Sequence, residues 1–415
     1  MIINTRKGDN MKILAGLDIG NGYVKGLAED MNSPFSTKVD IPSSVAYVTS
    51  INDLKVPADE VPGVIADIFN NADVSFDSPL IKDQNRRLFG TRGIYSGMST
   101  EEFDVFSHVS KANQDLSSIL VLGSCACIAL QDHYNRTGSL PDGILKADIR
   151  LATALPIREY MRHRAEYAGK FKKATHMVSF HNFEMPVRVE LNFEDVQVLA
   201  EGASAQFAIM NEGEAFIEAL LAKVREVDPS FNPAITAKDI KEATTIVGID
   251  IGEGTVNFPV FQNSKFNADV SFSFDKGYGS VLNNALDRLT DDGYPFSSRK
   301  DLANYIQTKP SAMQVPVYNK VFHVLEEETT ALVNDVKAQF KKSMGRIGPY
   351  IEVVYVYGGG ANPLRSELHP ALVEVSKSFN AEYPILYLDS KYSRNLNRQG
   401  LMYIAKAVAN GAYKK

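Results

Sequence analysis

Short apolar runs, separated by glycine, proline and polar residues, dominate the first 50 residues of the chain. Residues 12–17, 22–28 and 36–48 are rich in apolar and β-branched side chains, and Pro42 interrupts the third run. Runs of this length with turn residues between them are typical of β-strands. The pattern therefore predicts three successive strands, the third one broken.

The next part of the chain alternates between helical and strand patterns. Residues 117–135 have helical spacing and end near Gly138, whereas residues 147–155 are strand-like and stop at Pro156. After these segments the pattern predicts a charged helix over 158–171 and strands over 178–180, 185–193 and 196–200. A helix then begins at Glu201 and Gly202 and runs to about Met210, and another helix spans 214–227.

A second set of strands begins near Thr244, after a connector that contains Pro229 and Pro233. The pattern predicts strands over 245–250, 255–261 and 267–274, a helix from Ser280, helical segments over 297–332 interrupted by Pro310 and Pro316, a helix over 333–342, a buried strand over 351–357 and a last helix over 396–413. Two successive α/β domains account for this order of elements.

One short phrase occurs twice. The segment from Gly16 to Gly22, G-L-D-I-G-N-G, returns from Gly248 to Gly254 as G-I-D-I-G-E-G, with five of seven positions identical. Each copy follows an apolar run and precedes a second β-prone run, so each predicts a strand, a tight glycine turn and a second strand. Two such hairpins predict two similar domains that bind one phosphate chain.

Glycines at alternate positions leave backbone N–H groups open to a ligand, and such a turn binds phosphate oxygens. The carboxylate before each turn, Asp18 or Asp250, is suited to hold Mg²⁺, usually through water. The alternative is that both segments are ordinary hairpin turns. Repetition with matching flanks favours the phosphate interpretation over that alternative.

Composition and charge narrow the classes of function. The 415 residues correspond to two or three domains, and the net charge of −6 without a long basic run does not indicate direct nucleic-acid binding. Cys125 and Cys127, the two cysteines, lie in an apolar run and are expected to be buried rather than metal-bound. No apolar stretch reaches the ~18 residues of a membrane span, so no membrane association is expected.

Five segments in chain order resemble the actin-like ATPase superfamily, which includes actin, the seventy-kilodalton chaperones and the sugar kinases. The stretch from Asp18 to Lys25, D-I-G-N-G-Y-V-K, is similar to the first phosphate loop, and D-I-G-E-G from Asp250 is similar to the second. The other three are Glu201 at the first connecting segment, the adenosine motif from Tyr357 to Ala361, and the second connecting helix at residues 397–405.

Within that superfamily the sequence is most similar to the bacterial plasmid-segregation actins of the ParM type. Their P-S and T-G-L-P-x-x-x-Y stretches are echoed by residues 40–43 and 153–160, although Ala154 replaces the usual glycine. Two further departures are Asn257, where many members have a second Asp, and Glu253, where many have Gly.

The resemblance implies a duplicated, ribonuclease H-like α/β fold of two domains with a nucleotide cleft between them. We expect a disordered N-terminal extension over residues 1–11, domain I over 12–200 with an insertion at about 50–112, domain II over 201–395 with an insertion at about 290–345, and a C-terminal helix over 396–415 that packs back on domain I.

The resemblance also implies roles for individual residues. Glu201 orients or deprotonates the attacking water, Asp18 and Asp250 position hydrated Mg²⁺, and Lys25 reaches the β-phosphate. Each residue also has a purely structural alternative. Glu201 could stabilise the start of a helix, Asp18 and Asp250 could hydrogen-bond to their own turns, and Lys25 could be a solvated lysine on a strand. The nucleotide-binding residues expected in addition are Gly20, Asn21, Gly22, Gly252, Glu253, Gly254, Thr255, Gly277, Gly279, Gly358, Gly359, Gly360 and Ala361.

These expectations lead to one principal function and two alternatives. The principal hypothesis is a cytoplasmic, Mg²⁺-dependent ATPase (possibly acting on GTP instead) that forms head-to-tail filaments and moves plasmid DNA through a DNA-binding adaptor protein. The alternatives are a small-molecule kinase of the sugar-kinase kind and a nucleotide-binding scaffold that does not polymerise. No acceptor-site Asp for a sugar could be identified in the sequence.

Overall fold

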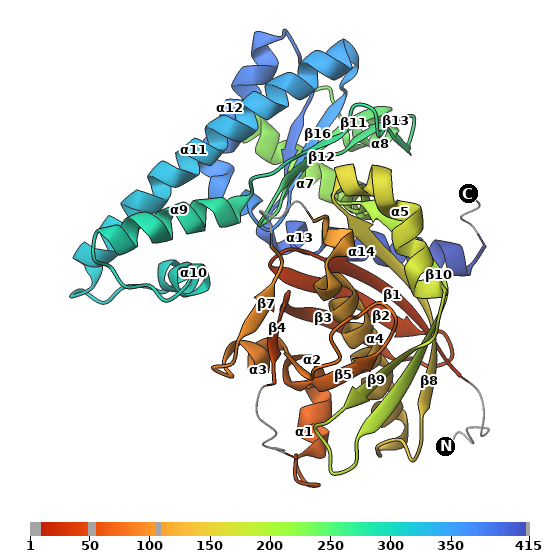
Figure 1. The fold of residues 1–415 in the computed structure, drawn as a ribbon. Helices are drawn as coiled ribbons and strands as arrows, with labels where there is room; N and C mark the ends of the chain where they lie inside the picture. The colour runs from red at the N-terminus through yellow and green to blue at the C-terminus, as the bar shows by residue number, and fades with distance from the viewer. Residues whose placement is uncertain (1–9, 49–54, 105–108, 412–415) are drawn as a thin grey trace. The chain divides into compact units, whose positions relative to one another are not determined.

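The computed structural model describes residues 10–48, 55–104 and 109–411, and the chain divides into two compact units (Figure 1). Unit 1 comprises Met1–Leu155, Glu159–Ala200 and Asn397–Lys415, and unit 2 comprises Pro156–Arg158 and Glu201–Leu396. The change of unit after Ala200 coincides with the expected domain boundary. Of the expected N-terminal extension, residues 1–9 lie outside the described residues, and Met11 is a buried strand residue instead.

Unit 1 is built on a ten-stranded sheet with the order β3-β2-β1-β8-β10-β9-β5-β6-β4-β7. The three strands predicted at the start are present, and the break near Pro42 separates β3 from β4. The strand bounds are β1 Met11–Ile19, β2 Tyr23–Asp30, β3 Ser36–Pro42, β4 Ser44–Tyr47, β5 Asp73–Asp77, β6 Arg87–Phe89, β7 Thr100–Glu102, β8 Leu145–Leu155, β9 His176–Phe180 and β10 Val187–Ala200.

The sheet of unit 1 corrects one sequence prediction. The separate strands expected over 185–193 and 196–200 are one strand, β10, because a bulge between Phe193 and Asp195 lets the chain continue its pairing with β8. The strands within the expected insertion, β5, β6 and β7, are hydrogen-bonded into the same sheet through β9 and β4.

The helices associated with this unit are α1 Val61–Ala66, α2 Ile68–Asn71, α3 Gly90–Ile94, α4 Asp115–Thr137, α5 Ile157–Lys172 and α14 Leu396–Ala409.

Helix α4 lies in the core of unit 1 and ends at Gly138, which has a left-handed φ of 70°. The sequence analysis found no apolar stretch long enough to span a membrane. By length and composition alone, α4 is nevertheless long and apolar enough to cross one. However, 94% of the apolar window is buried within the protein. The two cysteines are on this helix and are fully buried, as expected.

Two buried carboxyl groups meet where α4 passes the end of β2. Neither Asp30 Oδ2 nor Asp132 Oδ2 forms a hydrogen bond with a described residue, although Arg136 lies 3.8 Å and 3.2 Å from the two side chains. Burial and, next, the neighbouring carboxyl of Asp30 raise the pKa of Asp132 to about 7. A proton shared between the two carboxyl groups would satisfy both oxygens.

We expect this pair to make the protein less stable as the pH rises. Between about pH 4 and pH 7 the folded chain keeps a proton on Asp132 that the unfolded chain has lost, so the free energy of unfolding falls across that window. Asp132→Asn should therefore be more stable than wild type at pH 8, by roughly 1–3 kcal/mol, and should lose this advantage at pH 4. Urea unfolding at both pH values measures the difference, and an equal effect at both would contradict the shared proton.

Unit 2 repeats the strand plan of unit 1. Its sheet contains β17-β16-β11-β12-β15 in order, and β13, which also pairs with β14, pairs with the first half of β11 on the same edge as β12. In both units a central strand is antiparallel to the next strand of a hairpin and parallel to a strand on its other side, β8 for β1 and β16 for β11. The bounds are β11 Thr245–Ile251, β12 Val256–Phe258, β13 Val260–Gln262, β14 Lys265–Phe266, β15 Phe272–Phe274, β16 Val353–Tyr357 and β17 Ile385–Tyr387.

Prolines account for the differences from prediction in unit 2. The strand expected over 255–261 is two strands, because Pro259 between them has no N–H to donate. The helical segments expected over 297–332 and 333–342 are α10 and one long helix, α11, which carries Pro316 in its first turn, where proline is tolerated. The helices are α6 Ala203–Asn211, α7 Glu214–Val227, α8 Ala237–Glu242, α9 Tyr278–Asp291, α10 Arg299–Gln307, α11 Val315–Ile347, α12 Ala361–Ser378 and α13 Ser390–Ser393.

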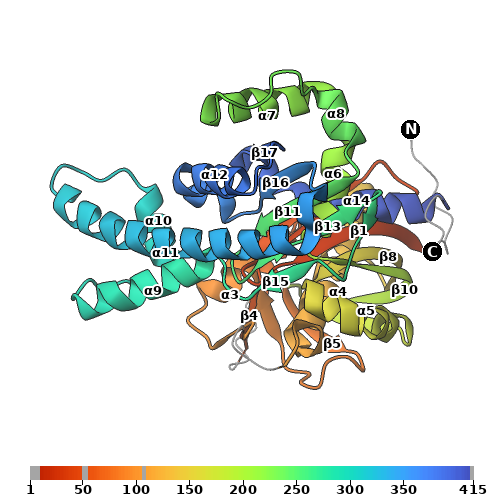
Figure 2. The same ribbon diagram turned by 90° about the horizontal axis from the view of Figure 1, so that it is seen from above.

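Helices α9 and α11 lie side by side, and both views show them leading away from the sheet of unit 2 (Figures 1 and 2). The chain leaves the sheet along α9, turns through α10 and returns along α11. Apolar side chains of α9 and α11 belong to the same buried cluster as the sheet. The segment expected as an insertion at about 290–345 thus consists of α10 and most of α11.

Candidate phosphate loops and catalytic carboxylate

The two repeated phrases form the same hairpin in the two units. Gly20 N donates to Tyr23 O at 3.0 Å, and Gly252 N donates to Thr255 O at 2.9 Å. The strand registers also match, because Asp18 lies opposite Lys25 and Asp250 lies opposite Asn257. The sequence repeat is therefore a structural repeat, down to its backbone hydrogen bonds.

The first loop is supported by Ser43, which follows β3. Its side chain donates to Gly20 O at 2.6 Å and its N–H donates to Gly22 O at 2.9 Å. A side chain at position 20 would lie 2.8 Å from Tyr23 O, so the turn requires glycine there. The loop carbonyls are thus held from behind by a buried serine, to which the sequence analysis gave no role.

Lys25 lies between two carboxylates across the sheet. Its strand partners are Asp18 on β1 and Asp40 on β3, and paired residues on neighbouring strands point to the same face. Arg398 of α14 is 3.8 Å from Asp40. Lys25 therefore has an acidic neighbour on each adjacent strand, and its expected phosphate contact stays a prediction.

The second loop is surrounded by the other predicted glycine segments of unit 2. Tyr278 N donates to Gly252 O at 3.0 Å, Gly279 N donates to Glu253 O at 2.8 Å, and Gly360 N donates to Ile251 O at 2.8 Å. A side chain at Gly277 would lie 2.4 Å from Glu253 O, and one at Gly279 would lie 2.8 Å from the same atom. The packing against the loop thus requires glycine at both positions, and their expected part in nucleotide binding stays a prediction.

Gly358 makes the tightest approach in this group. Its φ of 102° is a conformation that side chains disfavour, and a side chain there would lie 2.4 Å from Ile251 O and 2.5 Å from Asp250 Oδ1. Gly359 beside it is exposed, and Gly360 and Ala361 begin α12. Because α9 and α12 both begin beside the loop, their helix dipoles favour an anion in this region.

Glu253 carries a negative charge into the second loop, where phosphate is expected. Arg299 at the start of α10 lies 3.1 Å from its carboxylate. Both side chains are partly exposed, so the pair contributes little to stability. It does offset the charge of the acid next to the loop.

Glu201 lies between the end of β10 and Gly202, which caps α6 with a φ of 78°. A side chain at Gly202 would lie 3.2 Å from Asp250 Oδ2, and Tyr357 donates from its hydroxyl to Gly202 O at 2.8 Å. Burial, and next the charge of Asp250, raise the pKa of Tyr357 well above its ordinary value, so the hydroxyl keeps its proton. The backbone beside Glu201 is thus fixed against the strand that carries Asp250.

The Glu201 carboxylate is held by Asn257, the residue noted above as a departure from the family. Asn257 Nδ2 donates to Glu201 Oε2 at 3.4 Å, and Ser273 donates from its hydroxyl to Asn257 Oδ1 at 2.6 Å. The serine bond fixes the amide so that its donor side faces the carboxylate. Sequence reasoning assigned no role to Ser273 and noted Asn257 only as a departure from the family pattern. The structure places Asn257 opposite Asp250, as Lys25 lies opposite Asp18.

We expect Asn257→Asp to slow hydrolysis by about tenfold or more, because a carboxylate there repels Glu201 instead of donating to it. The new side chain has the same size and can still accept from Ser273. Phosphate release should recover relative to wild type as the pH is lowered from 8 to 6, since a protonated Asp again donates. A pH-independent loss would assign the defect to folding rather than to the orientation of Glu201.

Asp18 is partly buried and Asp250 is buried, and each stands at the end of a strand beside a glycine turn. Within the described residues no group of three or more His, Cys, Asp or Glu side chains could hold a metal ion. One carboxylate per loop suits Mg²⁺ that keeps several waters and is held mainly by phosphate oxygens. The residues fit that kind of site and not an all-protein metal cage.

Two protein-family models match the chain. Residues 16–203 match the family of actin-like proteins, N-terminal domain, and residues 248–370 match the archaeal actin homologue MreB-like, C-terminal family. No curated protein matches the chain in sequence.

Several solved structures share the fold over nearly the whole chain. A Bacillus thuringiensis ParM with ATP is 15% identical, covers 97% of this chain and 100% of its own, and has a TM-score of 0.57. A 15-stranded ParM filament from Clostridium botulinum is 17% identical with coverage of 96% and 99% and a TM-score of 0.59. An archaeal actin homolog is 12% identical with coverage of 95% and 99% and a TM-score of 0.57. The chain therefore has the mixed α/β actin-like fold.

Proposed function

This chain belongs to the actin-like protein family, and we propose that it is an ATP-dependent filament-forming protein that segregates plasmid DNA through an adaptor protein in the cytoplasm. The observation that carries the proposal is the repeated hairpin, whose two copies share sequence, register and the turn hydrogen bond. Two equivalent glycine turns, each with an Asp at the strand end, suit the two sides of one phosphate chain.

The roles of the residues follow from that proposal. The backbone N–H groups of the two loops bind phosphate oxygens, and Asp18 and Asp250 hold Mg²⁺, which when bound offsets the charge of the phosphates. Glu201, oriented by Asn257, holds the attacking water and accepts its proton. The glycine segment before α12, in which Gly359 is exposed, receives the base and sugar.

Similar proteins support assembly as part of the proposal. One of them was solved with ATP and another as a filament. Heterologous contacts between identical subunits generate an open filament when the rotation does not close a ring. Hydrolysis then weakens the subunit contacts, and an adaptor connects the filament to DNA, in agreement with the net charge of −6.

Light scattering and phosphate release, measured together after Mg·ATP or Mg·GTP is added, test this function. We expect a rapid rise in scattering that decays as phosphate accumulates, with the larger response to ATP. Phosphate release without scattering over a wide range of protein concentration would contradict filament formation. In that case the small-molecule kinase becomes the leading function, and candidate sugar acceptors would be tried next.

A further inference from the structure

The two repeated loops differ in charge at their central position. Asn21 stands between the two glycines of the first loop, whereas Glu253 stands between the two glycines of the second. A carboxylate at this position repels a phosphate that the neighbouring N–H groups would bind. Arg299 Nη2 lies 3.1 Å from Glu253 Oε1, so the acid that departs from the repeat has a cation beside it.

The position of Arg299 in its helix indicates that it serves the loop rather than the helix. Arg299 is the first residue of α10, after the N-cap residue Ser298, where the helix dipole disfavours a positive charge. The start of α10 is stabilised by an acid of its own, because Asp301 N donates to the Ser298 hydroxyl and the Asp301 carboxylate accepts from Ser297 N. The ion pair with Glu253 therefore accounts for an arginine that the helix itself disfavours.

Both partners of this pair are attached to backbone that is held in place. Glu253 O accepts from Gly279 N at 2.8 Å, which fixes the loop against the start of α9. Leu302, about one turn after Arg299, is fully buried in the core of unit 2. The guanidinium is thus held beside the loop from one side by the core and from the other by the carboxylate.

The phosphate that is cleaved belongs beside the second loop if the proposed function holds. Thr255 O accepts from Gly252 N within this loop, and the Thr255 hydroxyl accepts from Asn257 Nδ2 at 3.3 Å. The same amide donates to the Glu201 carboxylate. Because a water held by Glu201 attacks a phosphorus close to it, the terminal phosphate lies between Glu201 and the loop that carries Glu253.

We propose that Arg299 makes the second loop selective for a nucleoside triphosphate, because it neutralises Glu253 and donates to the terminal phosphate at the same time. A guanidinium has several N–H donors in a planar fork, so one nitrogen stays on the carboxylate while another meets a phosphate oxygen. A diphosphate lacks that oxygen and benefits only from the neutralisation. The inference rests on the proposed function and deepens it by naming the residue that distinguishes ATP from ADP.

Competition of ATP and ADP against a fluorescent nucleotide analogue, at protein concentrations too low for assembly, tests this role. Arg299→Gln should weaken ATP binding about 30-fold or more and ADP binding only about threefold, because ATP loses a charged hydrogen bond as well as the neutralisation. Glu253→Asn gives the second loop the sequence of the first and should keep the preference for ATP. The double variant should bind ADP like wild type and ATP about tenfold more weakly than wild type.

Arg288→Gln is the matched control. Arg288 of α9 forms its ion pairs with Glu327 and Glu328 of α11, so the loss of its charge should change neither affinity. The double variant also guards against a folding defect, because its affinity for ADP shows that the site is intact.

The outcomes separate this role from the function itself. Equal losses of ATP and ADP binding in Arg299→Gln, or a double variant that keeps the full preference for ATP, would show that Arg299 does not contact the terminal phosphate and would overturn the inference. A wild-type chain that binds neither nucleotide overturns the proposed function as well. A wild-type chain that binds ATP in preference to ADP but never assembles contradicts filament formation alone.

Discussion

Glu201→Gln is expected to slow ATP hydrolysis by about 10²–10⁴ while nucleotide binding and assembly persist. Glutamine keeps the size of the side chain and can still accept from Asn257, but it cannot take the proton of the attacking water. If hydrolysis weakens the lattice, filaments of this variant should also disassemble more slowly. Phosphate release and light scattering in one sample measure both effects.

The matched control is Glu214→Gln, which changes an exposed carboxylate in the first turn of α7. This variant should hydrolyse ATP at the wild-type rate. Normal turnover in Glu201→Gln would remove Glu201 from the catalytic residues. Loss of binding together with turnover would instead assign it to the nucleotide site as a whole.

Gly358→Ala is expected to weaken nucleotide binding by at least tenfold and to lower the free energy of unfolding by about 2–4 kcal/mol. The added methyl group would lie 2.4 Å from a backbone oxygen of β11 and 2.5 Å from the Asp250 carboxylate. Because the first of these neighbours is backbone and φ is 102°, the strand end or the loop must shift. Titration with a fluorescent ATP analogue and urea unfolding measure the two losses.

Gly169→Ala is the control for this change. Gly169 lies inside α5, and a side chain there would have no neighbour within 4 Å. Alanine should stabilise that helix by roughly 0.5–1 kcal/mol and leave nucleotide binding unchanged. A Gly358→Ala protein that binds nucleotide like wild type would show that the close packing behind the second loop is dispensable.

Local sequence determined the repeated part of the fold. Four elements were predictable: the hairpins at 18–25 and 250–257, helix α4, which ends at a glycine, and strand β8, which ends before a proline. Apolar periodicity and turn residues determine the conformation of the few residues around them, so a local pattern is enough. The repeat also identified the two Asp residues as equivalent before their registers were known. Where prediction was wrong, at β10 and around Pro259, one bulge and one missing N–H decided the strand limits.

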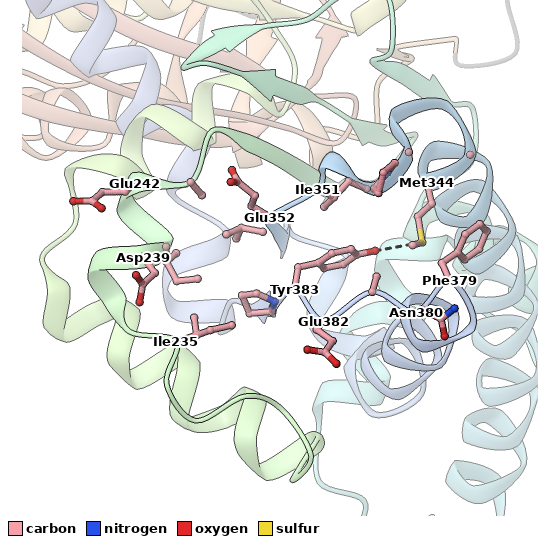
Figure 3. A pocket seen from close by; sticks show the side chains of 18 residues that line it. Ile235, Asp239, Glu242, Met344, Ile351, Glu352, Phe379, Asn380, Glu382 and Tyr383 are labelled. Carbon is pink, nitrogen blue, oxygen red and sulfur yellow. Dashed lines mark hydrogen bonds between the residues drawn. The ribbon is translucent and has the colours of Figure 1, made fainter.

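Only the tertiary structure decided what surrounds those loops. Ser43 behind the first loop, the packing of Gly277 and Gly279 on Glu253, and the Ser273–Asn257–Glu201 chain join residues that are far apart in sequence. The cavity of unit 2 that is lined by Met344, Phe379 and Tyr383 likewise draws its wall from α8, α11 and the segment before β17 (Figure 3). Turns and apolar periodicity can be identified from a short segment of the sequence. The partners of a side chain depend instead on which strands pair and which helices cover them, and no single segment contains that information.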